Sequence, residues 1–359
     1  MRFAIIGAGW YGCHLATALD ALGLDVEVFE QHNRPFHEAS GNNQFRLHQG
    51  FHYARHHATR IQSREGYMRF VERYPFLSDS VPHNIYAVPT FDSSIDFATY
   101  RLIMTATGVD FSEITTSPVP LRNVSGMLAT HERVLMLTRS REYFGRKLSG
   151  RLKLSHRVER VEDRGSHVEV DGKVYDFVID ATWGHFTRPS VPVFYEPTML
   201  LYYEGPRNFP AITLVDGPLA SLYPTEERTI YTLSSVTHTP LGSFATSSEA
   251  RRCLAAVDGN LVKAKVTAME TQISQYFDDF RERFRFVGPQ LSIKTKPIGA
   301  HDDRSCSVTR NGRIFSVMSG KIDTIFTATE RVLSLLEMRL GIEELSAPLL
   351  RSDIVEFTS

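Results

Sequence analysis

Residues 3–19 read FAIIGAGWYGCHLATAL and decide the fold class of this chain. An apolar run, a glycine-rich turn and a helix-like segment follow one another without a break. In such an arrangement Gly7 permits a tight turn, Gly9 lets the backbone approach phosphates, and Gly12 lets helix and strand pack closely. The N-terminus of the helix then offers unpaired N–H groups and a partial positive charge to an anion. The stretch therefore predicts a Rossmann-like site for a dinucleotide pyrophosphate.

A second strand-like run at 25–29, DVEVF, leads directly to an acidic residue, Glu30. Glu30 stands 18 positions after Gly12, where a carboxylate accepts hydrogen bonds from the adenosine ribose of a dinucleotide. A glycine motif alone is weak evidence, because glycine is common. Here the strand before the motif, the helix after it and the acidic residue all agree, so we expect a bound dinucleotide.

The composition is that of an ordinary globular protein. Its 359 residues are enough for two domains, or for one large fold with an insertion. The net charge of −1 argues against nucleic-acid binding through a broad basic face. Three widely spaced cysteines argue against a disulfide framework and suit a reducing compartment. No apolar run of about 18 residues and no signal-like segment occur, so we expect no membrane span and a cytoplasmic location.

The rest of the chain shows further helical and strand-like patterns. Residues 197–236 alternate apolar and polar side chains in short runs, which predicts an antiparallel sheet. The expected helices are 59–74, 93–106, 140–148, 247–284 with a break near Asp258-Gly259, and 325–340; the expected strands are 84–88, 152–161, 168–170 and 173–175 as a hairpin, 176–180 and 313–318.

The nucleotide-binding pattern is interrupted twice and so occupies three separate segments of the chain. We therefore expect an α/β fold in which a Rossmann-like domain with a parallel sheet is interrupted by an inserted, mostly antiparallel α+β substrate domain. The nucleotide-binding domain would comprise residues 1–82, 130–195 and 288–359. The substrate domain would comprise 83–129 and 196–287.

Two more turns extend the pattern. The strand at 176–180 runs into small residues at 181–184, and a late strand runs into 320–324 before the last helix. With the first glycine turn they resemble, in order along the whole chain, the FAD-dependent oxidoreductases of the D-amino-acid oxidase and glycine oxidase superfamily. The resemblance implies FAD rather than NAD, because the later turns have no role in a simple NAD domain. We expect 7–12, 180–184 and 319–324 to border one elongated cleft.

The segment 39–53, ASGNNQFRLHQGFHY, carries a second resemblance. It is similar to the stretch that, in the L-2-hydroxyglutarate dehydrogenase branch, has a Ser, an Asn, a His-x-Gly and a Tyr beside the flavin. Those places are occupied here by Ser40, Asn43, His48, Gly50 and Tyr53. The resemblance implies small polar groups around the flavin ring and a proton-accepting group above it.

Two positions depart from the family pattern. Residues 320–323, GKID, stand where family members commonly have a Gly-His-Gly-Gly-like turn. We still expect the N–H groups of this turn to face the flavin, because a helix follows. Lys296-Pro297 stands where the family often has an Arg before a Pro. A lysine offers a point charge instead of a bidentate fork, so this position does not itself imply a carboxylate substrate.

The candidate site residues fall into two groups. The catalytic candidates are His48, His52, Tyr53, Tyr223 and Lys296. The expected cofactor-binding residues are Gly7, Gly9, Trp10, Tyr11, Gly12, Glu30, Gln31, Ser40, Asn43, Arg46, Leu47, His48, Val158, Ala181, Thr182, Trp183, Gly184, Gly320, Lys321, Ile322, Asp323 and Thr324. No metal site is expected, because no cysteine or carboxylate joins the histidines of 48–57 at ligand spacing.

The resemblance implies removal of hydride from the C–N bond of an amine or amino acid, with FAD as the cofactor. Oxidation of a 2-hydroxy acid is the alternative implied by segment 39–53, with His48 taking the hydroxyl proton. A reduced-flavin mutase acting on a sugar nucleotide and a non-catalytic binding protein also stay open. The expected partners are a small-molecule substrate and an electron acceptor, O2 or another, while the oligomeric state stays open.

Overall fold

A six-stranded sheet forms around the N-terminal strand β1 (Arg2–Ile6). In the computed structural model, which describes residues 1–298 and 305–340, its strand order is β19-β20-β13-β1-β2-β9. All neighbours are parallel except the edge pair β19 and β20. The other strands are β2 (Asp25–Phe29), β9 (Leu152–Lys153), β13 (Phe177–Asp180), β19 (Ser307–Asn311) and β20 (Ile314–Met318). This arrangement confirms the predicted Rossmann-like domain.

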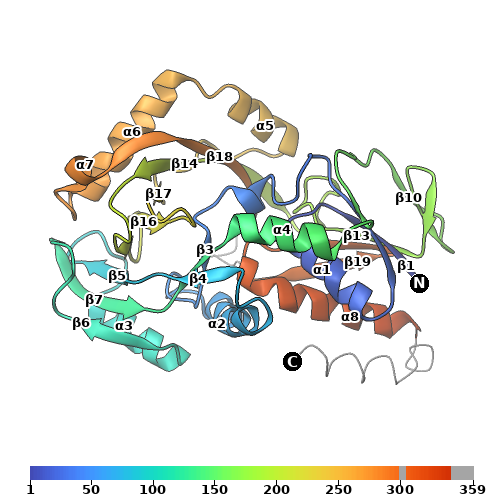
Figure 1. Cartoon of the computed structure of the whole chain (residues 1–359), viewed down its shortest axis with the longest axis horizontal. Coiled ribbons are helices and arrows are strands. Elements are labelled where there is room, and N and C mark those ends of the chain that lie inside the picture. Colours follow the sequence, from blue (N-terminus) through green and yellow to red (C-terminus); the bar gives the residue numbers. More distant parts are fainter. Residues whose placement is uncertain (299–304, 341–359) are drawn as a thin grey trace.

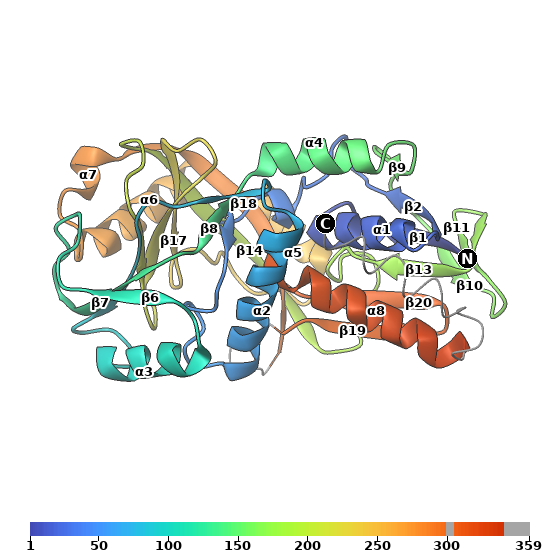
Figure 2. The same cartoon turned by 60° about the horizontal axis from the view of Figure 1, so that its bottom comes forward.

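Both faces of this sheet are covered, because successive residues of β1 point to opposite sides. Phe3 and Ile5 pack in the core beneath the helices, whereas Ala4 and Ile6 pack against a small three-stranded sheet. Figure 2 shows two of the helices, α1 and α8, side by side along the strands. The helices are α1 (Trp10–Ala21), α2 (His57–Arg73), α4 (Leu137–Lys147) and α8 (Ile325–Leu340), and the small sheet holds β10 (Val161–Asp163), β11 (Val168–Val170) and β12 (Lys173–Tyr175).

A second, eight-stranded sheet forms the other half of the molecule (Figure 1). Its order is β18-β14-β17-β16-β15-β5-β7-β6, and all its pairs are antiparallel except β15 with β5. This confirms the mostly antiparallel substrate domain. Its strands are β5 (Asn84–Pro89), β6 (Phe111–Ile114), β7 (Val124–Thr130), β14 (Val193–Glu204), β15 (Ala211–Leu214), β16 (Ala220–Pro224), β17 (Ile230–Ser235) and β18 (Arg285–Pro297).

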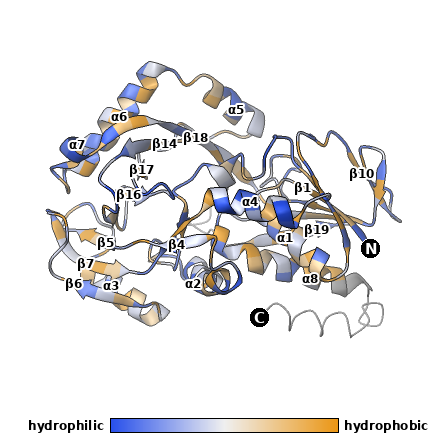
Figure 3. Cartoon of the chain, viewed as in Figure 1, coloured by the Kyte–Doolittle hydropathy of each residue, from blue (hydrophilic) through white to orange (hydrophobic). Residues whose placement is uncertain are grey.

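Helices and short elements complete the two halves. Figure 3 shows hydrophobic residues along the central strands and many hydrophilic ones on the outer helix α4. The remaining helices are α3 (Phe97–Thr107), α5 (Ser247–Ala255), α6 (Gly259–Ser274) and α7 (Phe280–Arg283), the 3-10 turns are η1 (Ala39–Gly41) and η2 (Ile322–Thr324), and a small sheet holds β3 (Arg46–Leu47), β8 (Arg133–Leu135) and β4 (Ser78–Ser80). Within the described ranges, no helix has both the length and the apolar character that a membrane crossing requires.

Strand pairing bears on the expected domain boundaries and corrects one predicted strand. Strand β18 pairs with β14 over nearly its whole length, so 193–195 and 288–297 lie in the eight-stranded sheet and not with the nucleotide-binding segments. We therefore propose domain boundaries at the outer ends of these two strands. The predicted strand 152–161 is wrong in part, because only 152–153 pair with β2 and 161–163 join the small sheet.

The predicted helix break and hairpin are confirmed. The side chain of Asp258 accepts a hydrogen bond from the backbone N–H of Leu261, at 2.8 Å, and so caps the start of α6. In the hairpin between β11 and β12, Asp171 and Gly172 both have positive φ, at 48° and 81°. Two positive φ values are what a tight two-residue hairpin turn requires.

Helix α2 packs closely on the turn η2, and one glycine makes this possible. A Cβ atom at Gly66 would lie 1.7 Å from the backbone oxygen of Asp323. We expect Gly66→Ala to lower the free energy of unfolding by about 1–3 kcal/mol, because η2 or α2 must move. Gly259→Ala is the matched control, since a Cβ there meets no atom within 4 Å. Thermal unfolding measures both variants, and equal melting temperatures would contradict the close packing.

Candidate active site

A single cavity of about 1530 Å³ lies between the two sheets and is bordered by all three predicted turns. Gly7, Gly9, Trp10 and Tyr11 contribute from the first turn. The second and third turns contribute through 181–183 and 319–322. Segments from both ends of the chain therefore surround one space, as the sequence predicted.

The glycine turn brings α1 against β1. Gly7 has φ +98°, in the region that favours glycine, and a Cβ at Gly12 would lie only 1.8 Å from the backbone oxygen of Gly7. Gly9 stands at the N-cap of α1 and supplies no side-chain cap. The first turn of the helix thus borders the cavity with backbone N–H groups that suit an anion.

Two side chains hold this turn in place. The carboxylate of Glu30 accepts hydrogen bonds from the backbone N–H groups of Ala8 and His32, both at 2.9 Å. The hydroxyl of Ser40, in η1, accepts a hydrogen bond from the N–H of Trp10 at 3.2 Å. Glu30 and Ser40 both border the cavity, so they can fix the turn and also contact a bound ligand.

The other two turns are also held by hydrogen bonds. Asp180, at the end of β13, accepts hydrogen bonds from the N–H groups of Thr182 and Thr187, both at 2.8 Å. The hydroxyl of Tyr11 donates a hydrogen bond to the backbone oxygen of Lys321 and lies 2.7 Å from the hydroxyl of Thr324. A residue of the first turn therefore anchors the third.

Segment 48–53 places aromatic side chains along the cavity. The ring centroids of His48, His52 and Tyr53 lie 5.3 to 5.8 Å from one another. The ammonium of Lys321 lies 3.1 Å from the centroid of the Tyr53 ring and 3.2 Å from the hydroxyl of Ser63. These four side chains that border the cavity form the polar group that we call the His48 cluster: His48, His52, Tyr53 and Lys321.

Both histidines of the His48 cluster are held neutral. Burial lowers the pKa of His48, with Lys321 and Arg46 adding to the effect while nearby Glu132 opposes it. Burial also lowers the pKa of His52, well below its usual value, with His48 and Arg46 adding to the effect. A lowered pKa favours the neutral imidazole, which has one unprotonated nitrogen that can accept a hydrogen bond or a proton from a bound group.

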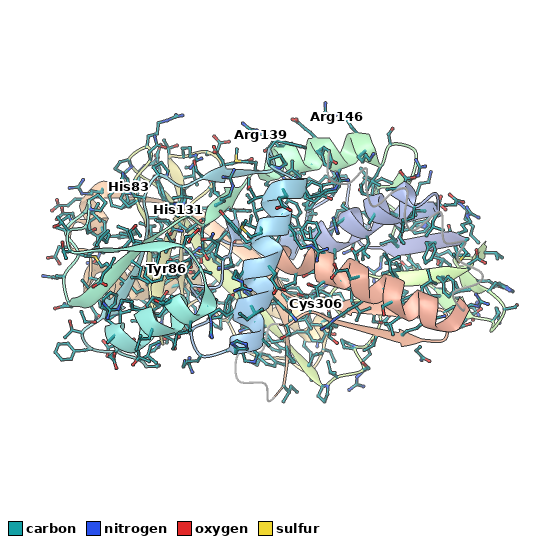
Figure 4. All side chains as sticks on the ribbon, turned by 90° about the horizontal axis from the view of Figure 1, so that it is seen from below. His83, Tyr86, His131, Arg139, Arg146 and Cys306 are labelled. Atoms are coloured by element: carbon teal, nitrogen blue, oxygen red, sulfur yellow. The ribbon has the colours of Figure 1, made fainter. Side chains whose placement is uncertain are left out.

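A buried carboxylate that sequence reasoning missed lies behind the cluster. Glu132, between β7 and β8, is 0% exposed, and its Oε1 lies 3.6 Å from Nδ1 of His48. It accepts hydrogen bonds from the N–H of Gln49 at 2.8 Å and the hydroxyl of Tyr86 at 2.7 Å. Figure 4 labels Tyr86 and His131, the residue directly before Glu132, in the same part of the molecule.

Most of the predicted site residues border the cavity, and six do not. The six are Gly12, Leu47, Gly184, Tyr223, Asp323 and Thr324. Tyr223 does not border the cavity: it is fully buried, and its hydroxyl donates to the backbone oxygen of Arg133 at 3.1 Å. Leu47 is a fully buried core residue. Lys296 does border the cavity, but its ammonium is paired with Glu196 at 2.6 Å.

The role of Arg46 also differs from the prediction. It borders the cavity, yet its guanidinium donates to the hydroxyls of Tyr86 at 2.8 Å and Ser221 at 2.7 Å. The guanidinium also stacks on the Tyr223 ring, 4.0 Å from the centroid. Arg46 therefore braces the wall of the cavity.

Two basic residues of α5, Arg251 and Arg252, line the cavity although no motif pointed to them.

The cavity fits a dinucleotide in shape and in chemistry. The close contact at Gly12 leaves no room for a side chain between helix and strand. The first turn of α1 suits a pyrophosphate, and the Glu30 carboxylate suits the hydroxyls of a ribose. FAD would thus be held by the glycine turn, Glu30, Ser40 and the turns at 181–183 and 319–322.

Comparisons with known proteins agree with this geometry. A family model described as DAO, FAD dependent oxidoreductase, matches residues 2–232. FAD-dependent monooxygenase FPY4 from Fusarium mangiferae is 58% identical over 333 residues, which cover 93% of this chain and 90% of that protein.

Solved structures share the fold at low identity. Glycine oxidase from Geobacillus kaustophilus has a TM-score of 0.71 at 13% identity and covers 96% of this chain and 99% of its own. FAD-bound L-alpha-glycerophosphate oxidase from Mycoplasma pneumoniae has a TM-score of 0.72 at 10% identity, over 94% of both chains. The chain therefore belongs to the DAO family of FAD-dependent oxidoreductases, and FAD is its cofactor.

Proposed function

We propose that this enzyme oxidises a carbon that bears a hydroxyl group, with His48 taking the hydroxyl proton. The observation that carries the proposal is an imidazole at the cavity wall, His48, whose Nδ1 lies 3.6 Å from the buried carboxylate of Glu132. An alcohol cannot readily lose hydride until its hydroxyl proton is accepted by a base. A neutral amine needs no such base, because its nitrogen lone pair can displace the hydride. The His48 cluster therefore favours the hydroxy compound over the amine that the sequence favoured.

In this proposal, FAD, His48, Lys321 and Tyr53 have separate roles. When bound, FAD supplies a two-electron acceptor that takes hydride from the substrate carbon. His48 has Nδ1 buried toward Glu132, which leaves Nε2 as the nitrogen on the cavity side. Nε2 accepts the hydroxyl proton, and the electron pair left on oxygen forms the new C=O bond. Lys321 and Tyr53 border the same space and can orient the substrate oxygen.

The arrangement of Arg46 adds to the case against an amino-acid substrate. Its two terminal nitrogens each donate to a wall hydroxyl, of Tyr86 and of Ser221, and the residue is only 4% exposed, which limits its access to a substrate carboxylate. Lys296 is paired with Glu196. We therefore place neutral hydroxy compounds ahead of 2-hydroxy acids as substrates.

Anaerobic reduction of the bound flavin tests this proposal. The FAD-loaded protein is mixed without oxygen with alcohols, sugars and 2-hydroxy acids, each beside an amine of the same carbon skeleton. We expect a hydroxy compound to bleach the visible flavin absorbance and its matched amine to leave it unchanged. Bleaching by the amine alone would overturn the proposal in favour of C–N oxidation.

Monooxygenation is the second candidate, favoured by the name of the relative that is 58% identical. In that case the reductant is NADPH or NADH and not the organic substrate. Bleaching by a nicotinamide alone, followed by incorporation of labelled O2 into a product, would support the second candidate and overturn the first.

A further inference from the structure

We propose that Glu132 is a positioning residue that holds His48 with its Nδ1–H toward the carboxylate and its Nε2 lone pair toward the substrate. This inference rests on the proposed function, because it concerns how His48 becomes an effective base. The place of Glu132 in the fold, behind a histidine at the cavity wall, carries the argument.

The carboxylate is held firmly in its place. Its two oxygens accept hydrogen bonds from the Gln49 N–H and the Tyr86 hydroxyl. Oε2 also lies 3.9 Å from Nε of Arg46. These contacts come from the loop after β3, from β5 and from β3, so three segments fix the carboxylate. Oε1 is then directed at Nδ1 of His48, 3.6 Å away.

The charge of Glu132 is retained in spite of complete burial. Burial by itself raises its pKa, but the contacts with His48, Arg46 and Tyr86 outweigh this effect and bring the pKa to about 2. An ionised carboxylate accepts hydrogen bonds and donates none. A proton on Nδ1 of His48 would be attracted to this carboxylate, whereas a lone pair on Nδ1 would be repelled by it, so Glu132 favours the tautomer that carries the proton on Nδ1.

Apart from the negative Glu132, the charged groups near His48 are cations. The charged and titratable groups that face it are His52 and Tyr53 on its own segment, Arg46 on β3, Lys321 before η2, and Glu132. The two cations lower the pKa of His48, whereas Glu132 raises it. Glu132 therefore supplies the negative charge that stabilises the imidazolium once a proton has arrived.

The proton transfer breaks one bond and forms one. The substrate O–H bond breaks, and the proton forms a new bond to Nε2 of His48. The Nδ1–H bond stays intact, and Glu132 stays unprotonated while its contact with Nδ1 shortens. The oxygen electron pair becomes the second C=O bond as hydride leaves the carbon for FAD. The proton is thus transferred once, from the substrate oxygen to His48, and Glu132 is not protonated.

The test compares Glu132→Gln with Glu270→Gln in the FAD-loaded enzyme. Glu270 is a matched control, because it also contacts a tyrosine and an arginine, Tyr203 at 3.1 Å and Arg281 at 3.0 Å, away from the cavity. Flavin content, melting temperature and kcat/KM as a function of pH are measured for both. The ¹⁵N shifts of His48, assigned by their loss in His48→Asn, report its tautomer in the unaltered enzyme.

We expect Glu132→Gln to lower kcat/KM by about 100-fold. Because the carboxylate raises the pKa of His48, its loss should also move the acidic limb of the pH profile to lower pH. Glu270→Gln should keep both the rate and the profile. A Glu132→Gln enzyme with an unmoved limb, and a loss no larger than its flavin loss, would overturn the inference.

Further outcomes separate this inference from the proposed function. If no hydroxy compound reduces the flavin of the unaltered enzyme, the proposed function fails and the inference fails with it. If His48→Asn still oxidises the hydroxy compound at the unaltered rate, His48 is not the base and the inference fails, while oxidation of the hydroxy compound stands. If His48→Asn is inactive but Glu132→Gln behaves as the unaltered enzyme, only the inference fails. Should Glu132→Gln not fold, the ¹⁵N shifts decide: a proton on Nδ1 supports the inference, and a proton on Nε2 overturns it.

Discussion

His48→Asn is expected to lower kcat by about 10² to 10⁴-fold while FAD stays bound, because proton transfer by a positioned base contributes about that much. Asparagine cannot accept the hydroxyl proton, but it is close to imidazole in size and keeps the cavity polar. The glycine turn and Glu30, which would hold the other end of the cofactor, are untouched. Stopped-flow reduction of the flavin by the hydroxy compound gives the rate, and visible absorbance gives the flavin content.

The pH dependence of the unaltered enzyme follows from the same residue. His48 works as a base only when neutral, so kcat/KM should hold above its pKa and fall as the pH drops through it. Burial sets that pKa below the usual value of 6.5, so activity should persist at neutral pH and decline on the acid side. His83→Asn is the control, because His83 is exposed and does not border the cavity. Equal losses of activity in His83→Asn and His48→Asn would contradict the role of His48 as the base.

Gly12→Ala is expected to abolish FAD binding. Its Cβ would lie 1.8 Å from the Gly7 oxygen, a distance at which α1 must move away from β1. The loss of stability should reach at least the upper end of the range of about 1–3 kcal/mol for overpacking. The movement would also carry the N–H groups of the helix away from the pyrophosphate. The measurement is flavin absorbance per protein after purification and after incubation with excess FAD.

Gly145→Ala provides the matched comparison. Gly145 lies within α4, and a Cβ there meets no atom within 4 Å. Alanine is a better helix former than glycine, so this variant should keep FAD and gain up to about 1 kcal/mol. A yellow Gly12→Ala protein with ordinary stability would show that the close contact at the turn does not matter.

The cofactor half of the site was predictable because its signals are local. The glycine turn, with positive φ at Gly7, and the acidic residue Glu30 directly after β2 are each recognised from a few adjacent residues. The substrate half depends on contacts between distant segments. Gln49 and Glu132 are 83 positions apart, and no motif links a carboxylate in a short loop to a histidine so far away.

Tyr223 shows a second reason why sequence patterns fall short. Every residue of β16 is buried, on both faces of the strand. Alternation identifies the inner face only when the other face is exposed. Tyr223 lies on the same face of β16 as Ser221, which borders the cavity. Arg46 contacts both side chains and itself borders the cavity. The sequence therefore could not show that Arg46 lies between Tyr223 and the cavity.

The hydrogen bond from Tyr11 to Lys321 joins positions 310 residues apart. The cofactor pocket is thus closed by nearly the first and nearly the last described segments of the polypeptide. During translation, the ribosome must release β20 and η2 before the flavin can be enclosed. Flavin occupancy therefore reports completed synthesis, and a nascent or truncated chain that ends before residue 319 should stay colourless however well its early strands have folded.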